Sequence, residues 1–506
     1  MIHAILRRRR PEPPPARTPH RPALAESLRA IAPRVGSSAL AGLLAGCAVP
    51  PAPMSVPPPP VAWTAPLPHA GRPADLVDWW KRFDDPLLVR LIDAGQQANP
   101  TLEQAALRIV EARADARVAG AALAPSVDAN ANVTRGNTLL LAAGAPATTT
   151  ISSGTLDAGW ELDVFGALRE RAAAARARLE GSRLQWHDAR VSLAAEIADA
   201  YVGLRACEAV VDLLEAQAES LAQTESLTLR KVQAGFEAPA NAALARANAA
   251  DARARAVAQR AECDASVVQL ATLAAMPVDA LRTELAPARA RLPEPQAFAV
   301  AAVPAQVLAQ RPDLAAAERA VAAAAAEAGA AQADRYPRLM LTGSIGRSAL
   351  HRAGDTFLVS TWSIVPALAA PLFDAGRRAG AAEAARARLE IAQADWRARA
   401  LDAVREVEQA LVRLDAAGRR LADARAAEEG YRQFLEAATT QWENGAISLL
   451  DLEQARRNAQ NASAALVQTQ RERIGAWLAL YKAVGGGWQP AAPAPSASLR
   501  AIEDAR

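Results

Sequence analysis

The chain contains one pattern of residues twice, and this internal duplication limits the folds that are open to it. Pro100, Pro125 and Arg135 recur as Pro312, Pro337 and Arg347 at a constant spacing of 212 residues. Farther along, the spacing is 210 residues for three further pairs: Gly166 and Gly376, Trp186 and Trp396, Gly235 and Gly445. A repeat of this length predicts two copies of one structural unit. We assign repeat 1 to residues 76–290 and repeat 2 to residues 300–487.

Each repeat begins with a helix that ends at a proline. Asn99 precedes Pro100, a pair typical of a helix N-terminus because Asn caps the first turn and Pro fits the first helical position. Asp85 and the proline after it predict a shorter helix just before this one. Repeat 2 opens in the same way near Arg311, and both helices give way to an alternating pattern at Pro125 and its counterpart.

The alternating segments predict one β-hairpin in each repeat, over residues 125–165 and 337–373. Each strand has one apolar and one polar face, which is typical of an outer-membrane barrel with lipid outside and water inside. A half-buried sheet in a soluble sandwich is the alternative. Four such strands per chain are too few to close a barrel around a channel, so the pattern requires an oligomer.

The phase of the alternation assigns individual side chains to the two faces. Trp160 and Trp362 fall on the apolar, lipid-facing side of their strands. Asp157, Glu161 and Asp163 fall on the polar side, which we expect to face the lumen of the barrel.

Long helical hairpins are predicted after each pair of strands, over residues 166–276 and 374–484. Proline is absent between Pro146 and Pro239 and again between Pro371 and Pro490, and Gly235 and Gly445 mark the turns. Helices this long, rich in Ala and polar around much of their circumference, cannot make a compact core. They are more typical of the staves of a helical tube or coiled coil.

The N-terminus has the features of an export signal. A basic run precedes a short apolar segment that ends in Leu44-Ala45-Gly46-Cys47, which resembles a bacterial lipobox. We therefore expect residues 1–46 to be a signal peptide and Cys47 to carry the lipid of an outer-membrane lipoprotein. Residues 47–75 are rich in proline and predict an extended tether, and residues 488–506 form a tail.

Composition excludes several other classes of protein. A net charge of +3, with Arg interleaved with Asp and Glu, gives no basis for nucleic-acid binding. Five scattered His and three Cys form no metal-ligand pattern, and the chain has no catalytic motif. We expect no enzyme activity, cofactor or metal. Cys207 and Cys263 lie singly in helical stretches, where each is expected to be a small buried apolar residue.

Several motifs resemble those of the outer membrane factors, the TolC and NodT-like lipoproteins of resistance-nodulation-division efflux pumps. They are Trp79-Trp80-x-x-Phe83-x-Asp85-Pro86, the stretch from Trp160 to Gly166, Gln310 to Leu314, Pro371-Leu372-Phe373-Asp374-x-Gly376-Arg377, and Asn444-Gly445-x-x-Ser448-Leu449-Leu450-Asp451. Each motif is weak alone, but their order and the duplication make the set specific.

The resemblance implies an α+β membrane duct. Three protomers would form a twelve-stranded outer-membrane β-barrel on an α-helical barrel that crosses the periplasm. Small molecules would pass outward without catalysis, and a periplasmic adaptor and an inner-membrane pump would be the partners. The same resemblance places a periplasmic gate after Gly445, with Asp451, Glu453, Arg456 and Arg457 as candidates. An ordinary solvated helix face with ion pairs three or four residues apart is the alternative.

Other functions remain open from the sequence. A chain with this fold could also be the exit duct of a type I protein secretion system or of a heavy-metal efflux pump. A periplasmic adaptor would flank a single hairpin with soluble β-domains, and a trimeric coiled-coil adhesin would lack the duplication. The two hairpins and the two amphipathic strand pairs argue against an adaptor. The lipobox and the NodT-like motifs favour small-molecule efflux over the other two ducts.

Overall fold

A computed structural model describes residues 63–67, 76, 79–139, 146–295, 297–298, 304–352 and 355–488. The proposed signal peptide, Cys47 and most of the tether lie outside these residues, as does the tail apart from its first residue. Among the described helices, none combines the length and the apolar composition needed to cross a membrane.

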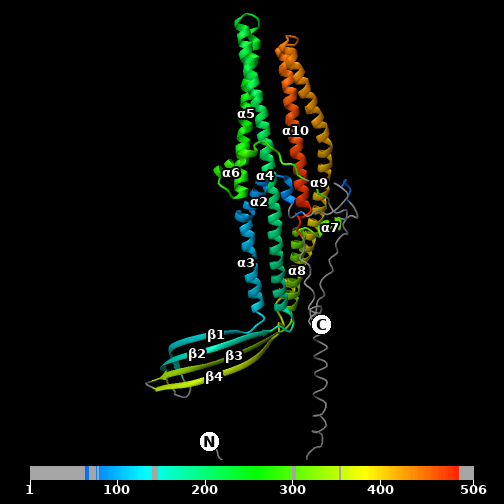
Figure 1. Cartoon of the computed structure of the whole chain (residues 1–506). Helices are drawn as coiled ribbons and strands as arrows, with labels where there is room; N and C mark the ends of the chain where they lie inside the picture. Colours follow the sequence, from blue (N-terminus) through cyan, green and yellow to red (C-terminus); the bar gives the residue numbers. More distant parts are fainter. Residues whose placement is uncertain are drawn as a thin grey trace, which may run out of the picture. The chain divides into compact units, whose positions relative to one another are not determined.

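Both repeats contain a helix followed by two strands and two long helices, drawn in Figure 1, and repeat 1 adds η1, α6 and η2. The bounds in repeat 1 are η1 (Trp79–Phe83), α2 (Pro86–Ala98), α3 (Pro100–Ala121), β1 (Ser126–Leu139), β2 (Pro146–Leu162), α4 (Ala167–Gln233), α5 (Pro239–Ala274), α6 (Val278–Leu285) and η2 (Ala286–Ala288). Those in repeat 2 are α7 (Pro304–Leu308), α8 (Pro312–Ala333), β3 (Arg338–Arg352), β4 (Asp355–Ala369), α9 (Arg377–Glu443) and α10 (Leu449–Ala483).

The helices begin where capping residues satisfy their free amide groups. Asp85 accepts hydrogen bonds from the amides of Leu87 and Leu88, and Asn99 accepts one from Thr101. The two longest helices, α4 and α9, each follow a glycine in the left-handed conformation, Gly166 at φ 85° and Gly376 at φ 84°. Each has 67 residues, which corresponds to about 100 Å of helix.

The four strands form one antiparallel sheet in the order β1-β2-β3-β4. Within the sheet, the two repeats meet at the β2–β3 pair, in which Leu156 lies opposite Ile345. This order leaves β1 and β4 as the two edges. In Figure 1 the sheet lies at the end of α3 and α8, away from the hairpin turns.

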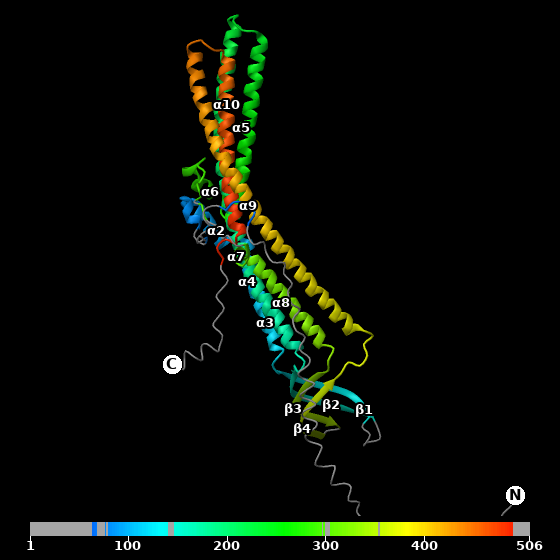
Figure 2. The same cartoon turned by 90° about the vertical axis from the view of Figure 1, so that its right-hand side faces the viewer.

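Helix α4 is the common neighbour of most other helices. It packs along α5 within its own hairpin, along α3 and α8 toward the sheet, and along α10 of the second hairpin. Figure 2 shows α3, α4 and α8 side by side above the strands. Two hairpins, α4–α5 and α9–α10, are therefore joined mainly through the α4–α10 contact.

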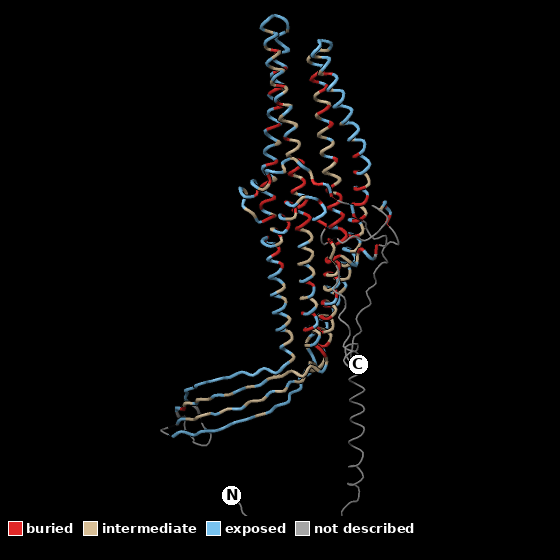
Figure 3. Tube along the Cα trace, in the orientation of Figure 1, coloured by how far each residue is buried: buried red, intermediate tan, exposed pale blue. Residues whose placement is uncertain are grey.

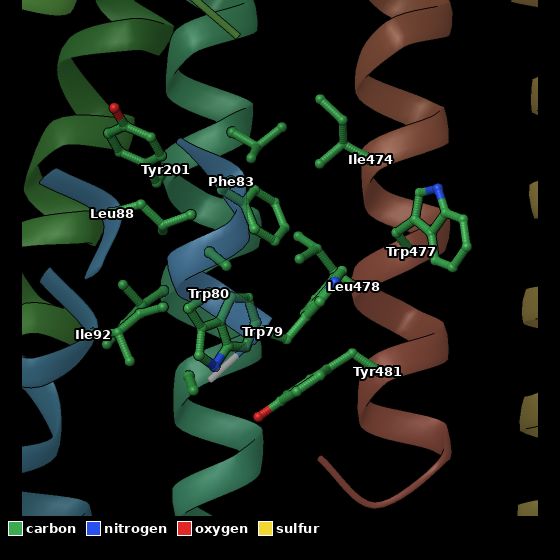
Figure 4. Packing of buried hydrophobic residues seen from close by; sticks show 14 of the residues in the cluster. Trp79, Trp80, Phe83, Leu88, Ile92, Tyr201, Ile474, Trp477, Leu478 and Tyr481 are labelled. Atoms are coloured by element: carbon green, nitrogen blue, oxygen red, sulfur yellow. The ribbon is translucent and has the colours of Figure 1, made fainter. Parts of the chain in front are cut away.

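The large core lies part-way along these helices, where η1, α2 and α6 pack against α4 and α10. Figure 3 shows the buried residues concentrated at this level, whereas the strands and hairpin turns are largely exposed. Trp79 is fully buried and stacks on Tyr481 with 5.1 Å between ring centroids. Figure 4 shows the tryptophans of η1 facing the side chains of α10. The aromatic motif around Trp79 thus fastens η1 to the end of the second repeat. We call η1, α2 and α6 the belt.

The structure corrects the prediction for two cysteines. Cys207 on α4 and Cys263 on α5 are not isolated residues but form a disulfide, with 5.7 Å between their Cα atoms. The prediction was wrong because it considered only cysteine partners a few residues away, and these two cysteines are separated by 56 residues. The two cysteines lie at equal distances along the chain before and after Gly235, so an antiparallel helical hairpin brings them together.

Candidate functional site

The two hairpin turns have the same backbone geometry. Gly235 and Gly445 both have positive φ, at 80° and 74°. In each turn the amide after the glycine bonds back into the preceding helix, from Phe236 to the carbonyl of Lys231 and from Ala446 to that of Gln441, both at 2.8 Å. Such bonds satisfy the last carbonyls of the helix while a left-handed glycine reverses the chain. The sequence repeat therefore predicted the turns correctly.

Asp451 lies in the first turn of α10 and closes a capping box with Ser448. Its Oδ2 accepts from the Ser448 amide at 3.1 Å and from the Ser448 hydroxyl at 2.7 Å, while its own amide donates to the Ser448 hydroxyl. These hydrogen bonds from the side chain and then the backbone of Ser448 lower the pKa of Asp451. Asp451 therefore is exposed and charged near the tip, and it also fixes the start of α10.

Glu453 lies in the contact between α10 and α4 and not on an exposed surface of the tip. Its side chain is buried at 4% exposure between α10 and α4. It accepts hydrogen bonds from Thr224 Oγ1 at 2.8 Å and from Arg456 at 2.8 Å, and Arg456 also donates to Ser220 Oγ at 2.7 Å. We call Ser220, Thr224, Glu453 and Arg456 the tip cluster. It joins the two hairpins within one chain.

Arg457 is separate from this cluster. Its guanidinium donates to Gln454 Oε1 on the same helix at 2.7 Å. The structure therefore brings Glu453 and Arg456 together but leaves Asp451 and Arg457 on other parts of the α10 surface. Helix geometry alone does not determine which side chains of α10 are buried, because this depends on which side of α10 packs against α4.

The polar face of the sheet carries Asp157, as predicted. Asp157 Oδ2 accepts from Asn130 Nδ2 at 2.7 Å and from Thr155 Oγ1 at 2.9 Å. Its neighbours across the sheet are Asp128, Ser344 and Ser363, all polar. Because directly paired residues share a face, this row continues across all four strands.

The other two predicted polar-face residues differ in position. Glu161 lies in β2 opposite Met340, near the helical end of the sheet. Asp163 lies beyond the end of β2, and its carboxylate accepts from the amides of Leu168 and Arg169 at the start of α4. The prediction that Asp163 belongs to the strand was wrong. The alternation of apolar and polar residues continues by chance into this aspartate, which caps the next helix. Asp374 bonds to the amides of Gly376 and Arg378 in the same way before α9.

The two tryptophans assigned to the apolar face share one side of the sheet. Trp362 pairs with Ile345, which pairs with Leu156, so all three side chains point the same way. Trp362 is 77% exposed in the single chain. Trp160 is half-buried at the helical end of the sheet, where its indole N–H donates to the carbonyl of Leu123 at 3.0 Å. Trp362 therefore lies halfway along its strand, whereas Trp160 lies near the helical end of the sheet.

Comparison with known proteins identifies this arrangement of hairpins and strands. The chain matches the family described as outer membrane efflux protein over residues 91–275 and 303–486, one segment in each repeat. The chain belongs to the outer membrane efflux protein family. Nodulation protein T of Rhizobium leguminosarum bv. trifolii is 28% identical over 457 residues, covering 89% of this chain and 97% of that protein.

Two further comparisons extend the relationship. The pyoverdine export outer membrane protein OpmQ of Pseudomonas putida is 30% identical over 457 residues, covering 89% of this chain and 96% of that protein. The solved structure of the outer-membrane channel OprN matches with a TM-score of 0.75 at 28% identity. The match covers 87% of this chain and 100% of that one. These findings confirm the predicted family and the fold of long helical hairpins with four antiparallel strands.

As an outer membrane efflux protein, the chain is the outer-membrane channel component of an efflux pump and not an enzyme. Among the described residues, no cluster of three or more His, Cys, Asp or Glu side chains is placed to hold a metal ion.

Proposed function

We propose that three copies of the chain assemble into one conduit by joining their sheets edge to edge. The observation that carries this proposal is the pair of open edges, β1 with 14 residues and β4 with 15. A long unpaired edge pairs readily with another strand. Four strands in the order β1-β2-β3-β4 place β4 of one copy antiparallel to β1 of the next. A closed ring of twelve strands then has no edges left.

Exposed apolar side chains on the outer helices support the same assembly. They lie on α3, α5 and α9, helices at the margins of the chain, and include Leu107, Val118, Val257, Leu401 and Phe434. Each is more than half exposed in the single chain. Neighbouring copies would cover these side chains and so complete a tube of helices below the barrel.

The conduit would carry small molecules passively from the periplasm to the exterior. The names of relatives such as the pyoverdine exporter OpmQ support a small organic substrate. Energy would come from an inner-membrane pump, coupled through a periplasmic adaptor at the hairpin tips. The purified protein in planar bilayers should form channels of one conductance, and negative-stain images should show hollow tubes. A protein that forms neither channels nor trimers would overturn the proposal.

The tip cluster would hold the periplasmic end closed. Glu453 and Arg456 join α10 to α4, so loss of this contact would free the tip of the second hairpin. Glu453→Gln should raise the single-channel conductance. Gln454→Glu, at the exposed neighbouring position, is the control that changes charge without touching α4. Equal conductance of the wild type and Glu453→Gln would place the gate elsewhere.

Asp451 is the candidate for a cation-binding ring at the same tip. Three copies of an exposed, ionised carboxylate around an axis would attract cations. Asp451→Asn should keep the capping geometry better than Asp451→Ala, and both should weaken block by trivalent cations. Unchanged cation block in both variants would leave Asp451 with its capping role alone.

Cys47 would anchor the protein to lipid. The proposal rests on the sequence Leu44-Ala45-Gly46-Cys47, which lies outside the described residues. Cys47→Ser should abolish incorporation of labelled fatty acid and leave trimer formation intact. Label remaining on the variant would contradict the proposal.

A further inference from the structure

A polar groove of about 690 Å³ lies along α4, between α5 and α10. Helices α4 and α10 form two facing walls of the groove, and α5 closes it on the remaining side. Its charged side chains are Glu196 and Asp199 of α4, with Arg471 and Lys482 of α10. This volume lies in the range of about 300–1,000 Å³ that is usual for small-molecule sites.

The groove and the belt lie on opposite sides of α4. Ile197, Tyr201 and Leu204 belong to the core beneath the belt and are buried. Asp199 and Gly203 line the groove, and their positions in the helix turn place them on the other side. On α10, Ile474, Trp477 and Tyr481 likewise face the core, whereas Arg471 and Gly475 face the groove. In the proposed trimer the belt must lie outside, because the lumen has to stay open.

Two glycines, which have no side chains, leave space for the charged side chains of the groove. A Cβ at Gly203 would lie 3.7 Å from the guanidinium of Arg471, and one at Gly475 would lie 3.7 Å from Asp199 Oδ1. The ion pair therefore lies over bare backbone on both walls. Any larger side chain at these positions would occupy the groove.

The charged groups of the groove are only loosely engaged with each other. Arg471 and Asp199 are 3.7 Å apart, longer than the roughly 2.7–2.9 Å of a charge-assisted hydrogen bond. Their side chains are 37% and 52% exposed. Such a pair contributes little to stability, so its charges remain available to a solute.

We propose that this groove is a lumenal binding site for zwitterionic small molecules. Acidic groups stand on α4 and basic groups on α10, so a solute with an ammonium and a carboxylate binds in one orientation. A solute with only one charge meets attraction at one wall and repulsion at the other. This proposal rests on the proposed function, because the groove faces a lumen only if three chains form the conduit.

Ampicillin and benzylpenicillin are a matched pair of probes, because ampicillin adds a single ammonium group to the same carboxylate-bearing scaffold. Their binding to the detergent-solubilised full chain is measured by titration calorimetry, and their block of current is measured in planar bilayers. We expect ampicillin to bind and block up to about fivefold more strongly than benzylpenicillin, as one partly exposed charge pair allows. Equal binding of the two probes would overturn the proposal.

The double variant Glu196→Gln/Asp199→Asn should reduce ampicillin binding to the level of benzylpenicillin. Glu284→Gln is the control, because Glu284 pairs with Arg90 on the belt side of the molecule. Gly475→Leu should abolish binding of both probes by filling the groove. Ampicillin binding that survives in both the double variant and Gly475→Leu would overturn the site.

The two assays separate failure of the site from failure of the conduit. Channels that conduct but show no difference between the probes in either assay would reject the site and retain the conduit. Ampicillin-selective binding in calorimetry, without any channel in bilayers, would retain the site and reject its lumenal position.

Discussion

Among single residues, the buried Arg311 is the clearest case of a side chain that joins distant segments. It is 8% exposed and bonds to Asp313 through two nitrogens, to Glu406 of α9 at 2.8 Å and to the carbonyl of Ala483 at 2.9 Å. The last bond satisfies a free carbonyl at the end of α10. Arg311 therefore connects the start of α8 to α9 and to the end of the second hairpin.

Removal of this side chain should be strongly destabilising. Arg311→Ala leaves Asp313 and a helix-end carbonyl without their partner, and we expect a loss of about 3–5 kcal/mol. Arg311→Lys should recover part of it, because Lys keeps the charge but cannot bridge all three partners. Thermal unfolding of the detergent-solubilised protein measures both. A melting temperature unchanged in Arg311→Ala would contradict the assignment.

A second residue, Asp188, should make stability depend on pH. Burial raises the pKa of Asp188, and the charge of Asp313 adds to the effect. An aspartate with a raised pKa destabilises the folded state while it is ionised, and the cost disappears once it is protonated in both states. Asp188→Asn should therefore raise the melting temperature at neutral pH.

The difference between Asp188→Asn and the wild type should vanish below about pH 3.9, the ordinary pKa of aspartate. The pKa of Asp313 is shifted in the opposite direction, downward. Its burial opposes ionisation, but its hydrogen bond and ion pair with Arg311 lower its pKa. Its stabilising contribution is present at neutral pH and is lost only as the pH falls through that lowered value. Asp423→Asn, at an exposed position of α9, is the control. A lower melting temperature for Asp188→Asn at neutral pH would contradict the argument.

Among the elements, the two helical hairpins differ in one covalent link. The disulfide between Cys207 and Cys263 ties α4 to α5, whereas the positions 210 residues later are Ala417 and Arg473. Within the described residues, only the first hairpin is cross-linked. Helix α4 of this hairpin also packs against α3, α8 and α10. The first hairpin is therefore the more firmly held of the two.

Loss of the disulfide should loosen the first hairpin without unfolding the sheet. It closes a loop with a sequence separation of 56 residues, for which roughly 2–4 kcal/mol of stabilisation is usual. Cys207→Ser/Cys263→Ser should increase amide exchange along α5 but not along α10. Treatment of the wild type with a reductant should reproduce the change. Equal protection of α5 before and after reduction would show that packing alone holds the hairpin.

The sheet allows a direct test of which face meets lipid. Trp362 lies on the apolar row and Asp157 on the polar row, in neighbouring parts of the sheet. A Lys on the lipid-facing side costs about 2–4 kcal/mol near the bilayer centre. Trp362→Lys should therefore reduce the membrane-inserted protein far more than Asp157→Lys. Similar insertion of the two variants, measured by heat-modifiable gel mobility, would reject the assigned faces.

For the molecule as a whole, the segment after β4 offers a test of assembly. Leu372 and Phe373 are 95% and 89% exposed in the single chain and follow directly from the open edge strand. A neighbouring copy joined at that edge would cover them. If three copies assemble as proposed, Phe373→Glu should shift the protein from trimer to monomer in light-scattering chromatography. Phe236→Glu is the control, because Phe236 is 83% exposed at a hairpin turn far along the chain from the sheet.

Interactions between residues close together in the chain account for the features that the sequence predicted correctly. The caps at Asp85 and Asn99, the turns at Gly235 and Gly445, and the phase of the strands are all visible in local patterns. Each follows from backbone geometry, capping or side-chain periodicity, which act over a few residues. For this reason the amino-acid sequence alone was enough to predict the long helical hairpins and the four antiparallel strands.

Packing between distant segments, in contrast, set the faces at which the helices meet. Glu453 is buried against Thr224, which precedes it by 229 residues. Arg311 and Trp79 likewise take partners from the far end of the chain. A long helix that is polar around much of its circumference has a weak preference for which side it buries. The choice therefore falls to contacts between segments hundreds of residues apart, which no local pattern encodes.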